Sequence, residues 1–370
     1  KGAIYVYNIV NNTVSQETIL SNTYSSTTYN GFGSIIKRVG DISFITGTSS
    51  NLVNVFKKVT QGNWTSTFST LIPVNSLGSD IYSDGNIILV GNPSNNYITT
   101  KTTTLPYIIQ NNQGGIAYYI SQNGTMKEQA PYILQGYPST MSNGQKFGSN
   151  IAGVKNGIVI SAPFSTIDDT GNTQTTEGNI YFYNFDYING TSSFRKCLSN
   201  TTYNNFGSIL SMSKDGSTVI VSGTVDTYDS FDIISTTSMS STATISTHST
   251  GLISSLGINE HDIISAGCQT YNTNTGIVEL FKFNIDNNNW EYNNYFQAFI
   301  NPNTFDNSKP NNFTTSPLVV ENDYVGGHIY MNSSKGLVYS SIGNSTDQQG
   351  NNSETSAGAV FVVDVYKHLQ

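Results

Sequence analysis

Short apolar runs alternate with polar turns along the whole chain, and residues 147–184 show this pattern clearly. A small-residue opening, Phe147-Gly148-Ser149, precedes a short apolar run, an Asn156-Gly157 pair and a second apolar run that ends in Ser161-Ala162-Pro163. A polar insert and an alternating run over residues 179–184 follow. Asn-Gly between runs rich in β-branched residues is typical of a type I′ hairpin, because both central residues need a positive φ. The segment therefore predicts one antiparallel sheet unit.

The same succession occurs six times along the chain. Its small-residue openings lie at residues 32–34, 77–79, 147–149, 206–208, 256–257 and 326–327. Spacings of roughly 45 to 70 residues are within the range of propeller blades. One unit cannot cover its own apolar faces, so the units must stack on one another. The repeats predict an all-β fold, a β-propeller of four-stranded antiparallel blades, with residues 1–370 as a single domain.

The two ends of the sequence match parts of a unit. Residues 2–7 are similar to a third strand, residues 14–20 to a fourth strand, and residues 358–365 to another third strand. We therefore expect a segment trimmed from a longer protein, which starts and ends within a repeat. Unpaired strand edges invite aggregation, so a ring must close its edges. Six openings and an N-terminal half-unit favour seven blades, with six as the alternative.

Some segments depart from the regular pattern. Tight turns precede Trp64 and Trp290, and we expect both rings to pack between blades; a ligand platform is the alternative. The Ser and Thr alternation of residues 226–250 suits a third and a fourth strand. A disordered, mucin-like linker is the alternative for this segment. Surface loops, where binding function usually lies, are predicted at residues 93–113, 164–177 and 301–315.

The order of these motifs resembles a known repeat family. Phe-Gly-Ser, a hairpin, an apolar strand that closes in Gly-Asn-Pro or Ser-Ala-Pro, and Gly-x-Ile-Tyr-x-Tyr are similar to the FG-GAP repeats of integrin α-subunit-like β-propellers, over nearly the whole chain. The resemblance implies a seven-bladed ring that acts in extracellular adhesion or ligand binding. It identifies no ligand, because a fold does not fix a function.

Many FG-GAP repeats bind calcium in the turn between the first two strands. Calcium needs six to eight oxygen ligands, several of them carboxylates, and each matching turn here has at most one carboxylate nearby. We therefore expect no integrin-like calcium site and no cofactor. A weak metal candidate lies in the third unit's insert, where a solvated polar loop is the favoured interpretation: Asp168, Asp169, Asn172 and Glu177.

Composition excludes several classes of partner. Only 11% of the residues are charged, against about 25% in a typical soluble domain, and the net charge is −8. Nucleic acids and anionic membranes need clustered Lys and Arg, which the sequence lacks. No apolar run approaches the ~18 residues that span a bilayer, and no signal-peptide pattern precedes Lys1. We expect neither nucleic-acid binding nor direct membrane insertion.

The sequence offers little for catalysis. Its four histidines show no HExxH or other metal-ligand spacing, and no nucleophile elbow or phosphate loop occurs. Distant residues could still converge in a ring, but we predict a protein that is not an enzyme. The even count of Cys197 and Cys268 suggests a disulfide. Bonded Cα atoms must lie within about 7 Å, and these units are not neighbours, so two buried thiols are the alternative.

Sequons for N-linked glycans are frequent, but Asn, Ser and Thr are so common that their number carries no information. Their placement does: Asn63, Asn123 and Asn189 lie in turns between predicted third and fourth strands, where a glycan fits. The remaining sequons are at Asn11, Asn200, Asn312, Asn332, Asn344 and Asn351.

These features predict an extracellular or cell-surface glycoprotein. Its propeller would be a non-catalytic adhesion, structural or assembly module that binds a protein, a glycan or copies of itself. The inserts 93–113 and 164–177 follow second strands of adjacent units and should emerge on one face. An accessory propeller domain of a secreted hydrolase, with its catalytic part outside this chain, is the alternative. The predicted binding face consists of Asn95, Asn96, Tyr97, Tyr107, Asp168 and Asp169.

Overall fold

The computed structural model describes the parts of the chain that form regular structure and the loops next to them. These are residues 3–10, 13–21, 32–33, 35–39, 43–47, 52–60, 62–71, 80–84, 87–94, 97–99, 108–110, 114–122, 125–134, 144–154, 157–168, 170, 172–173, 178–186, 191–225, 228–249, 251–259, 263–271, 276–296, 326–331, 336–341, 345–346, 353–354 and 359–364. The chain divides into two compact units, residues 1–201 with 205–208, and residues 202–204 with 209–370.

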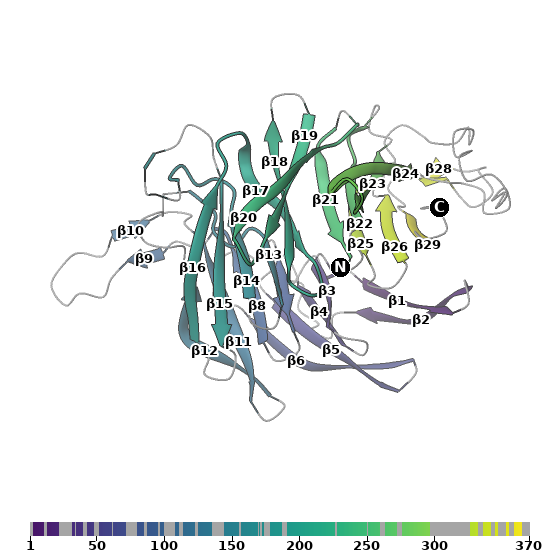
Figure 1. Cartoon of the computed structure of the whole chain (residues 1–370). Coiled ribbons are helices and arrows are strands. Elements are labelled where there is room, and N and C mark those ends of the chain that lie inside the picture. Colours follow the sequence, from purple (N-terminus) through teal and green to yellow (C-terminus); the bar gives the residue numbers. More distant parts are fainter. Residues whose placement is uncertain are drawn as a thin grey trace, which may run out of the picture. The chain divides into compact units, whose positions relative to one another are not determined.

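The first unit contains three four-stranded antiparallel sheets and two hairpins (Figure 1). The sheets are β3–β4–β5–β6, β7–β8–β11–β12 and β13–β14–β15–β16, and the hairpins are β1–β2 and β9–β10. Their strands are β1 (Ala3–Val10), β2 (Thr13–Ser21), β3 (Ile35–Val39), β4 (Ser43–Gly47), β5 (Leu52–Thr60), β6 (Asn63–Leu71), β7 (Ile81–Ser83), β8 (Ile87–Asn92), β9 (Tyr97–Thr99), β10 (Ile108–Gln110), β11 (Gly115–Gln122), β12 (Thr125–Leu134), β13 (Ile151–Val154), β14 (Gly157–Ala162), β15 (Asn179–Asp186) and β16 (Thr191–Ser199).

The second unit has two further four-stranded sheets, β17–β18–β19–β20 and β21–β22–β23–β24, although residues 205–208 of β17 belong to the first unit. It also has a three-stranded sheet, β25–β26–β29, and a short pair, β27–β28. Its strands are β17 (Asn204–Met212), β18 (Thr218–Val225), β19 (Tyr228–Ser235), β20 (Ser240–Ser246), β21 (Ile253–Ile258), β22 (Ile263–Cys268), β23 (Ile277–Asn284), β24 (Asn289–Phe296), β25 (Ile329–Met331), β26 (Gly336–Ser341), β27 (Ser345–Thr346), β28 (Ser353–Glu354) and β29 (Ala359–Asp364).

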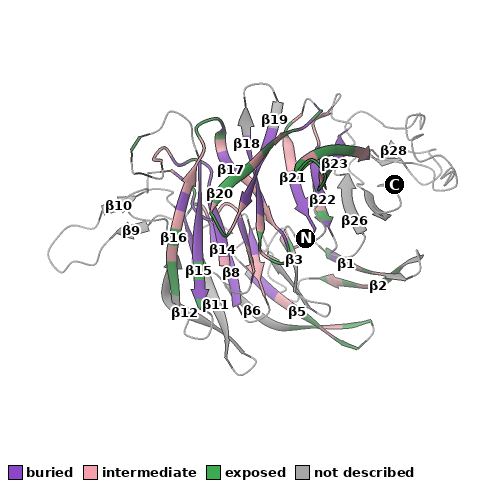
Figure 2. Ribbon diagram, in the orientation of Figure 1, coloured by how far each residue is buried: buried purple, intermediate pink, exposed green. Residues whose placement is uncertain are grey.

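Burial explains why the second strands of the sheets are mainly apolar in sequence. Every residue of β8 and of β22 is buried, whereas the fourth strands β20 and β24 are largely exposed (Figure 2). A strand buried on both faces has no exposed face for regularly alternating polar side chains, so these strands are mainly apolar, with Asn92 and Ser265 as buried polar exceptions. The strands predicted in residues 226–250 are confirmed as β19 and β20.

The FG motif packs aromatic rings inside the core. The ring of Phe147 lies 5.2 Å from that of Tyr181 and 6.4 Å from that of Tyr183, both in edge-to-face geometry. This cluster also contains Leu89 and Ile116 of the preceding sheet. Edge-to-face pairs at such distances add about 0.5–1.5 kcal/mol to the burial of the rings. Phe147 therefore joins two successive sheets.

The glycines of the motif let two backbones approach closely. A Cβ added to Gly91, near the end of β8, would lie 2.0 Å from the carbonyl oxygen of Gly148. A Cβ added to Gly114 would lie 2.0 Å from the carbonyl oxygen of Phe147, with which Gly114 forms an isolated bridge. In the second unit, a Cβ on Gly267 would lie 2.1 Å from the carbonyl oxygen of Gly326. Each Phe-Gly or Gly-Gly opening thus docks on the backbone of the sheet before it.

Both tryptophans pack against neighbouring sheets, as predicted. Trp64 packs against a cluster that contains Ile4 of the β1–β2 hairpin, and its indole nitrogen donates to Glu17 of β2 at 3.4 Å. Trp290 packs against a cluster formed by the β17–β20 and β21–β24 sheets of the second unit. These contacts anchor the sheets to each other through their outer strands.

Two local predictions are wrong, and the structure distinguishes between the two alternatives for the cysteines. Gly157 is not a central turn residue: it is the first residue of β14, pairs with Val154 and lacks a positive φ. The insert 93–113, predicted as a loop, contains the β9–β10 pair. Cys197 and Cys268 are both buried thiols without a disulfide. Residues 301–315 lie outside the described residues, and the number of blades stays a prediction.

Candidate functional site

The bases of both inserts of the first unit lie against one short segment, residues 144–148. Gly114, at the base of the 93–113 insert, pairs with Phe147. At the start of the other insert, the backbone N–H of Phe164 donates to the carbonyl of Gln145 at 3.3 Å. The loops after β8 and β14 therefore start on the same end of their sheets. We call residues 144–150, together with the described residues of 162–173, the insert end.

Hydrogen bonds among Asp168, Thr170 and Asn172 form a turn in the described part of the second insert. One carboxylate oxygen of Asp168 accepts hydrogen bonds from the backbone N–H of Thr170 (2.9 Å), the hydroxyl of Thr170 (2.7 Å) and the backbone N–H of Asn172 (2.8 Å). The backbone N–H of Asp168 donates to the carbonyl of Asn172 at 2.8 Å. An Asp side chain that accepts from residues two and four positions ahead is typical of a stable Asx-type turn.

Buried polar contacts fix this turn to the sheet. The side-chain amide of Asn179, the first residue of β15, donates to the hydroxyl of Ser165 (2.9 Å) and to the carbonyl of Ile167 (2.7 Å). The backbone N–H of Gly178 donates to the carbonyl of Ser165 at 2.8 Å. Both ends of the insert are thereby attached to β15, so the turn is positioned by the core of the sheet.

The weak metal candidate is only partly visible. Asp168 and Asn172 belong to the closed turn, whereas Asp169 and Glu177 lie outside the described residues. Among the described residues, no three His, Cys, Asp or Glu side chains come together as metal ligands do. One carboxylate oxygen of Asp168 accepts three hydrogen bonds within the turn, as in a structural Asx-type turn.

An exposed lysine and an exposed aromatic ring meet at the insert end. The ammonium of Lys146 lies 4.3 Å from the centroid of the Phe164 ring, within the range of a cation–π contact. Phe164 is 38% exposed, and Lys146 is exposed as well. Lys146 directly precedes the buried Phe147, and Phe164 lies two residues after β14 and donates its backbone N–H to Gln145, so the core positions both residues.

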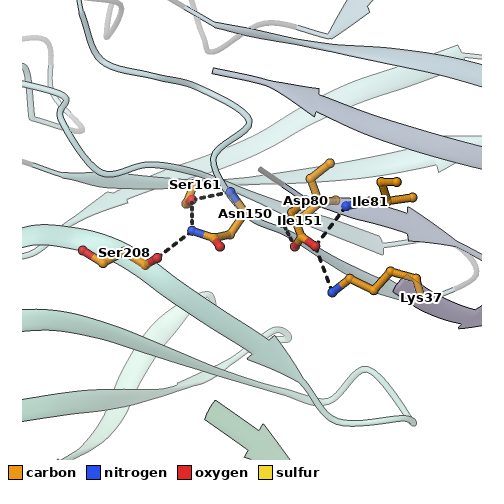
Figure 3. A network of polar contacts seen from close by, with 7 residues as sticks. All are labelled: Lys37, Asp80, Ile81, Asn150, Ile151, Ser161 and Ser208. Carbon is orange, nitrogen blue, oxygen red and sulfur yellow. Dashed lines mark hydrogen bonds and ion pairs between the residues drawn. The ribbon is translucent and has the colours of Figure 1, made fainter. Parts of the chain in front are cut away.

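A buried carboxylate close by connects three successive sheets (Figure 3). One carboxylate oxygen of Asp80 accepts a hydrogen bond from the backbone N–H of Ile81 (2.9 Å). The other accepts one from the backbone N–H of Ile151, the first residue of β13 (2.9 Å). Lys37 of β3 forms an ion pair with Asp80 at 2.9 Å. A carboxylate with ion-pair and amide partners can be buried at an acceptable cost, so Asp80 is a structural tie.

Asn150, next to Ile151, forms hydrogen bonds to β14 and to β17. Its side-chain amide donates to the hydroxyl of Ser161 (3.2 Å) and to the carbonyl of Ser208 (2.8 Å) (Figure 3). It also donates to the carbonyl of Gly207 (3.1 Å). Its backbone N–H donates to the same Ser161 hydroxyl at 3.0 Å. The first strands of the sheets are thus joined by side chains as well as by the glycine contacts.

The second unit has buried acids with similar roles. Glu279 of β23 accepts from the backbone N–H groups of His248 (3.0 Å) and Ser249 (2.7 Å). Asp232 of β19 accepts from the hydroxyl of Tyr203 at 2.6 Å, and burial raises the pKa of that tyrosine above its ordinary value. Burial, followed by the charge of Glu279, raises the pKa of Tyr292 to about 12. Each acid holds a loop or strand in place.

The remaining predicted site residues are placed as follows. Tyr97 is the first residue of β9, and Asn95, Asn96 and Tyr107 lie outside the described residues. Of the sequons, Asn63 is exposed at the start of β6 and Asn200 is half-buried directly after β16. The other predicted sequons fall outside the described residues: Asn11, Asn123, Asn189, Asn312, Asn332, Asn344 and Asn351.

Comparison with known proteins identifies the class of fold. No family model and no curated sequence matches the chain. Among solved structures, the Dos1 propeller is similar with 13% identity, coverage of 92% of this chain and 76% of that one, and a TM-score of 0.52. The β-propeller domain of Myceliophteria thermophila Cps50 (Swd1) is similar with 9% identity, coverage of 92% and 88%, and a TM-score of 0.52.

Both of these structures are propellers, and the four-stranded antiparallel sheets described above are the blades of that fold. The chain therefore has a β-propeller fold, as the repeats predicted. Identities of this size define the fold alone. In the described part of the chain, no helix has the length and apolar character needed to cross a membrane.

Proposed function

We propose that this propeller is a non-catalytic binding module of FG-GAP type, which takes a partner at the insert end of its first unit. The observation that carries the proposal is the fixed insert turn beside the exposed Lys146–Phe164 pair. Binding orders loops and side chains at a cost, and a surface that is ordered beforehand avoids much of that cost. The insert end meets this requirement, because both its turn and its aromatic ring are attached to the sheet.

The molecular setting that we propose is extracellular adhesion or assembly, with a protein, a glycan or another copy of the chain as partner. The repeat motif supports this setting through its resemblance to integrin α-subunit-like propellers. The low charge of the chain reduces electrostatic repulsion between neighbouring molecules. The exposure of Asn63 is compatible with an N-linked glycan on a secreted protein.

Replacement of inserts 93–113 and 164–177 by short Gly-Ser linkers tests the proposal. The control replaces the exposed turn 285–288 between β23 and β24 in the same way. Circular dichroism checks the fold, sedimentation velocity measures self-association, and a glycan array and a random peptide library measure other partners. We expect the insert variant to stay folded and lose binding, while the control keeps it. Unchanged binding by a folded insert variant would place the binding surface elsewhere.

A further inference from the structure

We infer that Lys146 and Phe164 form an anchor for a carboxylate-bearing peptide segment of the partner. This inference rests on the proposed function and specifies its partner. Its basis is a lysine in a strained backbone conformation, whose ammonium is held over an exposed ring beside a rigid turn.

The strain becomes visible when the repeats are compared. Lys146 has a φ of 57° and directly precedes Phe147-Gly148; Asn205 has a φ of 54° and directly precedes Phe206-Gly207. The two positions are equivalent in detail, because the serine after each Phe-Gly donates its hydroxyl back to the carbonyl of Lys146 or Asn205. The corresponding position before Phe32 is Gly31 in the sequence. Glycine and asparagine tolerate this left-handed region, whereas lysine does not favour it.

A strained residue that persists in a fold is a reason to look for a function. At this position the backbone is left-handed and the ammonium of Lys146 lies over the Phe164 ring. Among the described residues, no carboxylate forms an ion pair with Lys146. The insert end therefore presents an ordered cation next to an exposed apolar ring, on a chain that has only 16 Lys and Arg residues.

The chemistry of the surrounding turn favours a peptide over a sugar. A sugar needs hydroxyl and amide groups that can bond to it, but one carboxylate oxygen of Asp168, the Thr170 hydroxyl and the Asn172 side-chain nitrogen already form hydrogen bonds within the turn. One face of the Phe164 ring is also covered by the ammonium, which leaves less surface for a stacked sugar ring. A carboxylate needs only the ammonium, with which it forms a charge-assisted hydrogen bond. An acidic side chain with an adjacent apolar group of a peptide matches both parts of the pair.

Two exchanges between equivalent repeat positions separate strain from binding. Lys146→Asn should raise the midpoint of thermal unfolding, because it removes strain, and Asn205→Lys should lower it. A merely structural Lys146 would give a less stable Lys146→Asn variant, since the cation–π contact would be lost without compensation. That result would contradict the inference.

The binding test selects a random dodecapeptide phage library on the wild-type protein. We expect enriched peptides to carry Asp or Glu, and their affinity to fall about tenfold or more with Lys146→Asn or with Phe164→Ala. Salt should weaken the binding of the wild type. The control Lys282→Asn, which removes an exposed lysine of β23, should bind like the wild type.

Three outcomes would overturn the inference. The enriched peptides could lack acidic residues, Lys146→Asn could bind them as well as the wild type, or a glycan array could show carboxylated sugars as the ligands where no peptide binds. The proposed function fails separately. If replacement of the inserts abolishes binding while the Lys146 and Phe164 variants retain it, only the inference is wrong; if both leave binding unchanged, both are wrong.

Discussion

Substitution of Gly91 by alanine places a methyl group where the backbone of the next sheet already lies. The new Cβ would be 2.0 Å from the carbonyl oxygen of Gly148 and 3.0 Å from its carbonyl carbon. Optimal contacts between heavy atoms are at about 3.5–4.0 Å, so the two backbones must separate by more than an ångström. Such a shift would strain backbone hydrogen bonds, because the N–H of Gly91 donates to the backbone carbonyl of Asp80 (3.0 Å) and that of Gly148 to the backbone carbonyl of Ser161 (2.9 Å).

The loss of stability in Gly91→Ala has two contributions, overpacking of the core and strained backbone hydrogen bonds. Overpacking of a dense core costs about 1–3 kcal/mol, and each backbone hydrogen bond that is stretched or broken costs about 0.5–1.5 kcal/mol. We therefore expect Gly91→Ala to lower the free energy of unfolding by about 2–5 kcal/mol. Gly157→Ala is a matched control on the second strand of the adjacent sheet. Its added Cβ meets only Val154 Cγ2, at 4.0 Å, and the backbone has no positive φ, so a gain of about 0.4–1 kcal/mol is expected.

Urea denaturation followed by near-UV circular dichroism measures both variants. Repeat arrays can unfold in parts, so hydrogen exchange should accompany it. The expected result for Gly91→Ala is faster exchange of amides near Gly91 and Gly148, with exchange in Gly157→Ala unchanged. Equal stability of the two variants would refute the close backbone contact, and with it the reason for glycine in the motif.

Four further predictions concern charged and polar groups. Asp80→Ala should lower the free energy of unfolding by about 2–4 kcal/mol, because two buried backbone amides and an ammonium lose their acceptor. Urea denaturation measures this loss, and a smaller value would mean that water replaces the carboxylate. Lys58, and then the backbone N–H of Gly62, hold the pKa of Glu17 below its ordinary 4.5. The stabilisation by Glu17 is therefore complete above pH 4.5 and lost as the pH falls through the lower folded-state pKa; Glu17→Gln should remove this acid dependence, and an identical acid profile in both proteins would contradict it. Glycosidase treatment of native protein in heavy-oxygen water should label Asn63, whereas unmodified Asn63 would argue against a secreted glycoprotein. EGTA should leave the melting temperature unchanged, and a clear fall would reveal a calcium site that the turns did not suggest.

The strands and their order could be predicted because the signal is local. The run Ile87–Val90 is apolar throughout, and similar runs recur at blade spacing along the chain. Even the weak pattern of residues 226–250 was sufficient, since alternating Ser and Thr suit a pleated strand. Register was less certain: the Asn156-Gly157 pair suggested Gly157 as a central turn residue, whereas Gly157 pairs with Val154 in the sheet.

The side-chain ties could not be predicted, because they join residues far apart in sequence. Asp80 and Ile151 are 71 positions apart, and Glu279 binds backbone amides 30 and 31 positions earlier. No spacing rule connects such pairs, since they meet only when successive sheets stack. The predicted binding face had a similar limit: of its six residues, only Tyr97 and Asp168 lie among the described residues.

Comparison of the repeats separates residues that the fold requires from residues that it merely tolerates. The backbone contact of Gly91 with Gly148 admits no side chain, so a glycine there reports a structural requirement. The position before Phe-Gly requires a left-handed backbone, which Asn205 satisfies at little cost and Lys146 satisfies at a higher one. A repeat that keeps the costlier residue gains nothing in stability from the backbone. The Lys146 side chain, placed over the exposed Phe164 ring, is therefore the one that we connect with binding, and not one of the more buried acids.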